Sequence, residues 1–430
     1  MGKENYFSIY AINLFIGIFS MSIIYFFSYS INSLKYISIG FVFLSILYKI
    51  ILDKGLFYSL WYAFPVSFLF FIAPELIYYS SSYYDEKMFE AAILICVSGV
   101  GILFCSICKK RHYISSCFLS EENSNVTQLY LVVFLSFIYV YYTAPVAIST
   151  FFTGRSITNE SSTLGSFAIF IDTLAYILPV LFLLLYKQRR ISALLVILSI
   201  CVVIVFQVLI GVRYKIIFTV SMFSLVYLDL NNINKKYVIS IILSVFLLSI
   251  VSWALRGEGV DSFLNNLTSY NSDNIQQIFY YFAGVIQYYE HHDFSTYPKY
   301  SLFSLYSLFP RALWEGKPEM IGSWILDTGY FVENFSPSHS GSVSFFGPLY
   351  ADFGRSALVF VFPISWLIIY LDYLSSKNIG KYSFKGILCS AIFPTIFFTV
   401  RSLNTSLINF YILAIVLFIY FSLAKIRLKL

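Results

Sequence analysis

The feature that most constrains this chain is a succession of apolar stretches about twenty residues long, the length of a membrane-spanning helix. Only 12% of the side chains are charged, against about 25% in ordinary globular chains, so a soluble fold would expose large apolar patches. We therefore expect an all-α polytopic membrane protein with about twelve transmembrane helices. The predicted spans cover residues 6–30, 34–52, 56–80, 88–108, 126–151, 164–186, 191–210, 214–230, 237–255, 345–372, 384–400 and 405–424.

Lysine and arginine are distributed unevenly between the short loops. The loops on the side of the two termini carry most of them, for example Lys109, Lys110 and Arg111 after the fourth predicted span. Because such residues are retained in the cytoplasm, we expect both termini to be cytoplasmic. The net charge of +6 follows from this rim, so it does not indicate a nucleic-acid partner. The first apolar stretch is too long for a signal-peptide core, and we expect it to remain as a span.

One long external segment separates the ninth predicted span from the tenth. It divides the chain into nine spans over residues 1–255, a loop over 256–345 and three spans over 346–430. Within the loop, residues 272–290 place apolar side chains at intervals of three and four, with Ser272 as the predicted N-cap, which indicates an amphipathic helix. This helix would lie on the bilayer surface or on the ends of the spans, or would form a lid over a cavity that opens to lipid.

Four short elements occur in a fixed order on the outer side of the predicted topology. They are Gly211-x-Arg213, Arg256-Gly257, Pro310-Arg311-x-x-Trp314-x-x-Lys317-Pro318, and Tyr350-x-x-x-Gly354 after a glycine-rich stretch. This order, together with the late external loop, resembles the O-antigen polymerase (Wzy) family, and the O-antigen ligases share much of the same pattern. The resemblance implies a GT-C-like fold and a metal-independent glycosyltransferase that faces the periplasm from the bacterial inner membrane.

The resemblance also implies the substrates and partners of such an enzyme. Donor and acceptor would be undecaprenyl-pyrophosphate-linked oligosaccharides within the lipid bilayer, polymerised into O-antigen for lipopolysaccharide or into a similar surface polysaccharide. A chain-length regulator protein is a candidate partner. Neither a cofactor nor a nucleic acid is expected.

Six basic residues are candidates for binding the pyrophosphate groups: Arg213, Lys215, Arg256, Arg311, Lys317 and Arg401. Arg213 and Lys215 open a predicted span from its outer side, where a helix N-terminus favours an anion and a guanidinium matches phosphate oxygens. Alternatively, Arg213 would contact lipid headgroups, and the other three arginines would each make a structural or headgroup contact. Acidic residues outnumber basic ones across residues 256–355, so attraction of an anionic donor must come from individually placed cations.

Glycosyl transfer also needs a base for the acceptor hydroxyl and surfaces that hold sugars. The first candidate base is His339, because it lies in a stretch of small residues where the backbone can approach a substrate closely. Glu258 and Asp352 are the other two candidates. Trp314 and Tyr350 are candidates for contacting sugar. Further loop aromatics that could supply stacking faces and hydroxyls are Tyr280, Tyr281, Tyr288, Tyr289, Trp324 and Tyr330.

The cysteines do not form a recognisable metal site. Cys105 and Cys108 make a Cys-x-x-Cys pair, but no second pair completes it. We interpret all six cysteines as small buried hydrophobes. The sequence also lacks the glycine-rich motif ending in Gly-Lys-Ser/Thr, which argues against nucleotide hydrolysis.

The competing function class is a carrier, either a lipid-linked oligosaccharide flippase or a secondary transporter. Carriers keep ionisable residues near the bilayer midplane and often contain internal repeats. The ionisable residues expected inside spans are Glu75 and Asp172, both close to a proline-containing stretch, whereas the histidines gather in the external loop. This distribution favours chemistry at the outer surface over alternating access. A structural or receptor role is a third interpretation.

Overall fold

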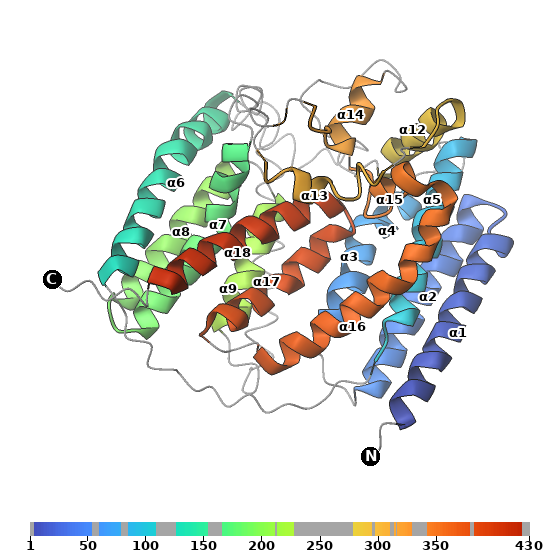
Figure 1. Ribbon diagram of the computed structural model, residues 1–430, viewed down its shortest axis with the longest axis horizontal. Helices are drawn as coiled ribbons and strands as arrows, with labels where there is room; N and C mark the ends of the chain where they lie inside the picture. Colours follow the sequence, from blue (N-terminus) through green and yellow to red (C-terminus); the bar gives the residue numbers. More distant parts are fainter. Residues whose placement is uncertain are drawn as a thin grey trace. The chain divides into compact units, whose positions relative to one another are not determined.

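The protein is helical throughout the part of the chain that the computed structural model describes (Figure 1). The described residues are 4–53, 60–78, 85–108, 126–153, 166–210, 213–227, 278–294, 297–309, 314, 316–328, 342–378 and 382–423. These ranges contain no β-strand, and a single parallel bridge joins Ser344 to Ser402. The predicted all-α class is therefore confirmed.

The helices that precede the long loop are α1 (Glu4–Phe27), α2 (Ile31–Leu52), the 3₁₀ helix η1 (Leu60–Tyr62), α3 (Ala63–Phe71), α4 (Ala73–Tyr78), α5 (Glu86–Cys105), α6 (Val126–Thr153), α7 (Ser166–Lys187), α8 (Ala193–Leu209) and α9 (Arg213–Tyr227). Those that follow are α12 (Ile278–His291), α13 (Phe303–Tyr306), α14 (Ile321–Asp327), α15 (Gly347–Phe353), the 3₁₀ helix η6 (Gly354–Phe360), α16 (Val361–Asn378), α17 (Phe384–Thr399) and α18 (Leu403–Leu423).

Eight helical stretches within the described ranges are long and apolar enough to cross a membrane. Three further apolar helices are shorter, namely Ala193–Leu209, Lys215–Tyr227 and Phe384–Thr399. The predicted span over 237–255 lies outside the described residues. The polytopic membrane class is thus confirmed, while the number of twelve spans stays a prediction.

Two of the predicted spans are interrupted helices. The span predicted over 56–80 breaks at Ile72, and α4 restarts with Pro74 in its first turn, where the missing N–H of proline costs no helical hydrogen bond. The span predicted over 345–372 changes direction at Gly354, whose φ is +59°. A Cβ atom at Gly354 would lie 2.8 Å from Cζ of Phe294, so both the backbone angle and the space require glycine there.

The chain divides into two compact units that interleave along the sequence. The first unit comprises Met1–Tyr113, Asp273–Ser376 and Ile396–Leu407, and the second comprises Ile114–Ser272, Lys377–Thr395 and Ile408–Leu430. The units therefore cut across the three consecutive blocks that hydropathy predicts, because segments from both sides of the long loop pack together in each unit.

In the first unit, α5 is the central helix, and α1, α2 and α12 pack against it (Figure 1). Every residue from Leu94 to Cys105 is buried. The approach of α1 is close, since a Cβ atom at Gly101 would lie 2.5 Å from Sδ of Met21. Small residues at a helix–helix contact are typical of membrane proteins, where packing rather than water exclusion drives association.

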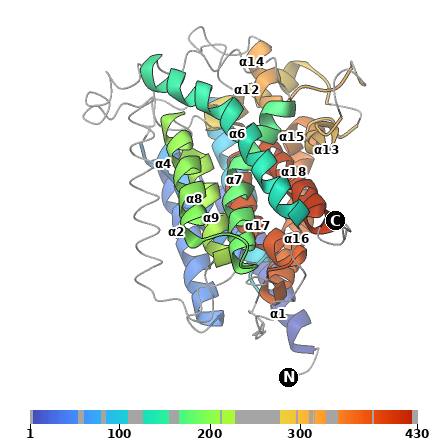
Figure 2. The same cartoon turned by 90° about the vertical axis from the view of Figure 1, so that its left-hand side faces the viewer.

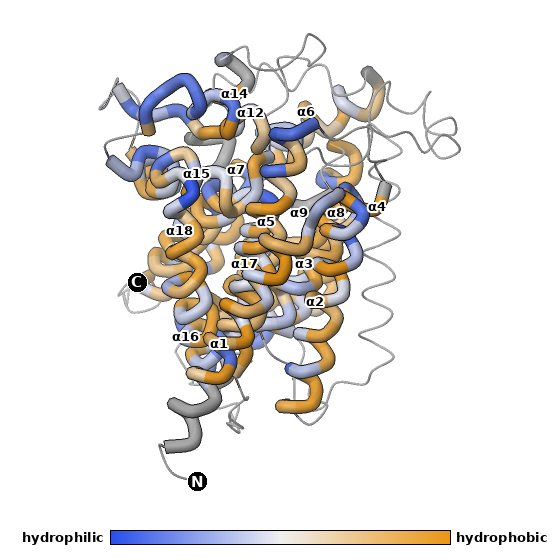
Figure 3. The backbone as a smooth tube through the Cα atoms, turned by 90° about the vertical axis from the view of Figure 1, so that its right-hand side faces the viewer, coloured by the Kyte–Doolittle hydropathy of each residue, from blue (hydrophilic) through white to orange (hydrophobic). Residues whose placement is uncertain are grey.

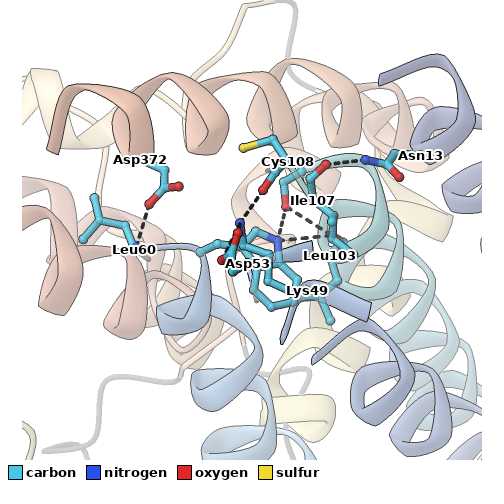
Figure 4. A network of polar contacts seen from close by, with 10 residues as sticks. Asn13, Lys49, Asp53, Leu60, Leu103, Ile107, Cys108 and Asp372 are labelled. Atoms are coloured by element: carbon cyan, nitrogen blue, oxygen red, sulfur yellow. Dashed lines mark hydrogen bonds and ion pairs between the residues drawn. The ribbon is translucent and has the colours of Figure 1, made fainter. Parts of the chain in front are cut away.

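Side chains satisfy the carbonyl groups at the C-terminal end of α5 (Figure 4). Lys49 forms a fully buried ion pair with Asp53 at 3.1 Å and also donates to the carbonyl of Cys108. Asn13 donates to the carbonyl of Ile107.

Hydrogen bonds also hold the start of the neighbouring helix η1. Nε1 of Trp61 donates to Oγ of Ser106 at 2.9 Å and to the carbonyl of Leu103 at 3.3 Å. The backbone N–H of Leu60 donates to Asp372 of α16 at 2.7 Å (Figure 4). The side chains of Lys49, Asn13, Trp61 and Asp372 are thus paired within the protein, as burial favours.

In the second unit, α7 contacts α6, α8 and α9 (Figure 2). Polar side chains connect these helices inside their apolar surroundings: Gln207 of α8 donates to Thr219 of α9 at 2.9 Å, and Thr173 of α7 lies 3.4 Å from Asn409 of α18. Interhelical hydrogen bonds of this kind fix the register of packed spans.

Candidate functional site

The candidate site lies in the layer that covers one end of the first unit. This layer consists of α12, α13, α14 and the segment that connects them, and we call the end that carries it the outer end. Hydrophilic residues gather around α14 and α15, while α1 and α5 are mostly hydrophobic along their lengths (Figure 3). The long loop therefore supplies a polar cover for apolar spans.

Helix α12 corresponds to the amphipathic helix predicted over 272–290, and the predicted N-cap Ser272 lies outside the described residues. Except for Tyr280, its apolar residues from Ile278 to Ile286 are at most 8% exposed, because α5 and α15 pack against them. The helix therefore lies against the ends of the spans, one of the three predicted positions, with its apolar face covered by protein. The role as a lid stays a prediction.

A buried carboxyl group holds the N-terminus of α12. Both carboxyl oxygens of Glu75, which is fully buried in α4, accept hydrogen bonds at 2.9 Å, one from the backbone N–H of Ile278 and one from that of Phe279. The first N–H groups of a helix have no partner within it, so Glu75 satisfies donors that would otherwise be buried unpaired. The sequence places Glu75 inside a predicted span, and an acidic residue in an apolar run requires a partner, but hydropathy does not show which residue that partner is.

One ion pair connects the layer to the first turns of α5, and a second connects η6 to them. Lys87 pairs with Glu290 near the end of α12, and the guanidinium of Arg355 contacts one oxygen of Glu90 at 2.5 and 3.1 Å. The side chain of Arg355 is 67% exposed, so solvent screens this second pair.

Asp352 of α15 is buried and its carboxylate is already occupied by hydrogen bonds. It accepts from the backbone N–H groups of Lys299, Tyr300 and Ser301 at 2.7–3.1 Å, and from the Ser301 hydroxyl at 2.6 Å. Successive N–H groups around one anionic group form a nest. This geometry favours Asp352 as an anchor for the chain at 299–301 rather than as the base predicted from sequence.

Lys317 is also enclosed by protein. It is 9% exposed, and its Nζ donates to the carbonyl of Phe309 at 2.8 Å and to that of Ser307 at 3.2 Å. These are carbonyl groups at the end of α13, which lack helical partners. The contacts favour a structural role for Lys317 over the predicted role in pyrophosphate binding.

Arg401 lies in the turn between α17 and α18, at the outer end of the first unit. Its Nε donates to Oγ of Ser342 at 3.2 Å, and the adjacent Ser402 pairs with Ser344. Ser342 ends the stretch of small residues that contains His339. Arg401 therefore contacts the chain three residues after the predicted base, a proximity that the sequence did not indicate.

The two predicted sugar-contacting residues differ in accessibility. Tyr350 is buried, with its ring 5.3 Å from that of Phe282. Trp314 is 36% exposed and packs edge-on against Tyr306, with ring centroids 5.4 Å apart. Only Trp314 therefore presents a ring surface to the outside.

A second aromatic group contains Tyr288, Tyr289 and Trp324, three of the residues expected to offer rings or hydroxyls to sugar. Tyr288 stacks on His292 at 4.0 Å and meets Trp324 of α14 edge-on at 4.7 Å. Tyr289 and Tyr300, hydrogen-bonded to each other, lie in the same cluster; burial raises the pKa of both above the usual range, with Asp352 contributing to each. These two phenols therefore stay protonated at physiological pH and act as hydrogen-bonding groups, not as bases.

Lys215 belongs to the second unit. It forms an ion pair with Asp172 of α7, so the two ionisable residues meet near the ends of their helices. This pairing explains how Asp172 is accommodated in a span. An anionic ligand of Lys215 would have to compete with that carboxylate.

The other predicted site residues are not described by the structure. His339, Glu258, Arg256, Arg311 and the side chain of Arg213 lie outside the described residues. Their roles stay predictions.

No group of three or more His, Cys, Asp or Glu side chains that could hold a metal ion occurs among the residues with a described placement. Cys96, Cys105 and Cys389 are buried as expected, and Cys108 is partly so. The expectation is wrong for Cys201, which is exposed on α8. An apolar thiol on a membrane-spanning surface has no need of protein cover.

Comparison of the chain with family models, curated proteins and solved structures gives no match. A functional assignment therefore has to come from the residues themselves.

Proposed function

We propose that the protein is an integral membrane glycosyltransferase that polymerises undecaprenyl-pyrophosphate-linked oligosaccharide repeat units into O-antigen or a similar polysaccharide on the periplasmic side of the inner membrane. The proposal rests on the order of sequence elements described above. The single structural observation that supports it most is the contact of Arg401 with Ser342, because it joins a candidate cation to the stretch that carries the candidate base.

The length of the chain limits how far His339 can lie from Ser342, the residue that Arg401 contacts. Three residues of extended backbone span at most about 11 Å, so His339 starts within that distance of Ser342. A lipid-linked pyrophosphate and the first sugar attached to it are of comparable size. One substrate could therefore contact Arg401 through its phosphate while His339 faces the acceptor hydroxyl.

The chemistry would place positive charge where negative charge develops. As the glycosidic bond to phosphate breaks, the pyrophosphate leaves as an anion, and a guanidinium fixed beside it lowers the barrier. Arg401 is partly buried, so its charge is less screened than that of an exposed arginine. His339 would accept the proton of the attacking hydroxyl.

The test compares two arginines of the first unit. Arg401→Ala should lower polymer formation by about 100-fold, the usual loss when one charge-stabilising donor is removed. Arg355→Ala removes an equally cationic but exposed side chain paired with Glu90 and should leave polymerisation unchanged. The measurement is the chain-length ladder of surface polysaccharide in a deletion strain complemented with each variant at equal protein level. Wild-type ladders from Arg401→Ala would exclude the assigned role of Arg401.

The deletion strain itself discriminates between function classes. Loss of long chains with a single repeat unit retained on the lipid core is expected for a polymerase. Loss of every repeat unit would instead indicate the ligase or the flippase, and would overturn the proposal.

A further inference from the structure

A second apolar element of the outer layer is not covered by protein. Residues 300–310 contain no charged side chain, although the surrounding loop is rich in charges, and Lys299 and Arg311 flank them directly. Helix α13 forms the middle of this element. A short apolar stretch bracketed by cations is typical of peptide segments that lie at a membrane surface.

The exposed side chains of this element are its large apolar ones. They recur every third residue along the turn of α13 and continue at its end. Their exposures are 38% for Leu302, 43% for Leu305, 43% for Leu308 and 56% for Phe309. Phe303, Ser304 and Ser307 between them are buried. One side of the element therefore packs on the protein while the other presents a row of leucine and phenylalanine.

Tyr300, at the start of the element, is hydrogen-bonded to residues near the ends of two apolar helices. The side-chain amide of Asn404, in the first turn of α18, donates to the carbonyl of Tyr300 at 3.0 Å. Asp352, near the outer end of the span Gly347–Ser375, holds the N–H group of the same residue. Two segments that are long and apolar enough to span a membrane therefore hold Tyr300 level with their ends.

The polar groups of the element are turned inward. Lys317 satisfies the carbonyls of Ser307 and Phe309, and the Ser307 hydroxyl donates to the carbonyl of Ser304 at 2.7 Å. The Tyr306 hydroxyl donates to the carbonyl of Pro298 at 3.2 Å. In water such carbonyls and hydroxyls would find solvent partners, but in a membrane they have to be satisfied by the protein.

We propose that Leu302–Phe309, together with Trp314, is an interfacial element that inserts into the outer leaflet of the membrane. Its occupant is the headgroup–acyl boundary of the phospholipid bilayer, which such elements enter by about 5–10 Å. The half-exposed Trp314 matches the preference of tryptophan for this zone. Lys299, whose Nζ lies 4.9 Å from the centre of the Tyr300 ring, is placed to reach lipid phosphates. The apolar residues of Leu302–Phe309 take no part in the proposed glycosyl transfer, and for Trp314 the contact with lipid replaces the predicted contact with sugar.

Spin labels on the full-length protein test the insertion. Leu305, Leu308 and Phe309 are changed singly to cysteine in a variant whose six native cysteines are alanine, and each is labelled in vesicles of phosphatidylethanolamine and phosphatidylglycerol. Asp293→Cys, at an exposed acidic residue of the same layer, is the matched control. The measured quantity is the ratio of label accessibility to oxygen, which partitions into lipid, and to a water-soluble nickel complex.

The ratio should be several-fold higher at the three apolar positions than at Asp293. Equal ratios would place the element in water and overturn the proposal. A photo-crosslinking amino acid at Leu308, in the protein with its native cysteines, provides a second measurement. Crosslinks to phospholipid are expected. Crosslinks between two copies of the chain, with neither reagent reaching the labels, would assign the surface to a dimer and overturn the proposal.

Discussion

Helix α12 and the element Leu302–Phe309 are both apolar parts of the outer layer, but they are buried in different ways. The apolar side chains of α12 are covered by α5 and α15, whereas the leucines around α13 are about as exposed as residues on the lipid-facing side of a span. The sequence pattern marks α12 as the more amphipathic of the two. An amphipathic pattern therefore shows that a face is buried, but it does not show whether protein or lipid buries it.

Equal substitutions at Phe282 and Phe309 give the largest contrast between the two regions. Phe282→Ala in α12 removes a fully buried ring and should lower the free energy of unfolding by about 3–5 kcal/mol. Phe309→Ala removes a ring that protein only partly covers and should change it by no more than about 0.5 kcal/mol. Thermal unfolding of the purified variants in detergent measures the stability of each. Equal losses of stability would show that protein covers Phe282 and Phe309 to the same extent.

The carboxyl group of Glu75 should matter next, because α12 depends on it. Glu75→Ala leaves the buried N–H groups of Ile278 and Phe279 without that partner, at an expected loss of about 2–4 kcal/mol. Glu75→Gln retains one acceptor oxygen and should lose roughly half as much. Urea unfolding in mild detergent compares the two variants with the wild type. A Glu75→Ala protein as stable as the wild type would mean that α12 is held by apolar packing alone.

Asp352→Asn separates an anchor from a catalytic base. The amide offers one acceptor oxygen to donors that now share two, so we expect a loss of about 2–3 kcal/mol and faster amide hydrogen exchange at residues 299–301. Transfer activity per folded molecule should be little changed. A drop of about 100-fold or more at unchanged stability is what general-base catalysis would give, and it would restore the catalytic assignment.

The smallest expected effect concerns Lys317. Lys317→Met keeps the length of the side chain but removes the donors to Ser307 and Phe309, so the loss should be about 1–2 kcal/mol, with exchange accelerated locally around α13. Lys317→Arg preserves the charge and the donors and serves as the control. If Lys317 instead binds pyrophosphate, Met should raise the KM for the lipid-linked substrate without altering exchange at α13.

Among the described residues, most ends of the long apolar helices were predictable to within a few residues, because each apolar run has its own hydropathy maximum, whereas the short helices α13 and α14 were not predicted. The breaks in the helices at Ile72 and Gly354 were not predictable, since a break does not alter the hydropathy of the apolar run that contains it. Arg401 was expected at an outer turn, and it lies there relative to the first unit. The contact of Arg401 with Ser342 was not predictable, because hydropathy does not show which residues far apart in sequence lie close together in space.

The roles of Asp352 and Lys317 were unpredictable for a more general reason. Both side chains bind backbone groups, the N–H groups of residues 299–301 and the carbonyls of Ser307 and Phe309. Backbone N–H and carbonyl groups occur along any sequence, so no pattern of side chains predicts which of them Asp352 and Lys317 bind. A charged residue in a glycine-rich loop therefore looks the same whether it binds a substrate or fixes the loop.

The tie between Asn404 and Tyr300 also bears on how the protein is made. The two residues are separated by 104 positions, and Asp352, the other tie on this segment, also follows it in the chain. During synthesis the chain at 299–301 leaves the ribosome before either partner exists. Glu75 and Lys87, which hold α12, precede the layer in the chain, but the segment 299–301 can be fastened only after α15 and then α18 have been made, which makes this contact a late step of folding.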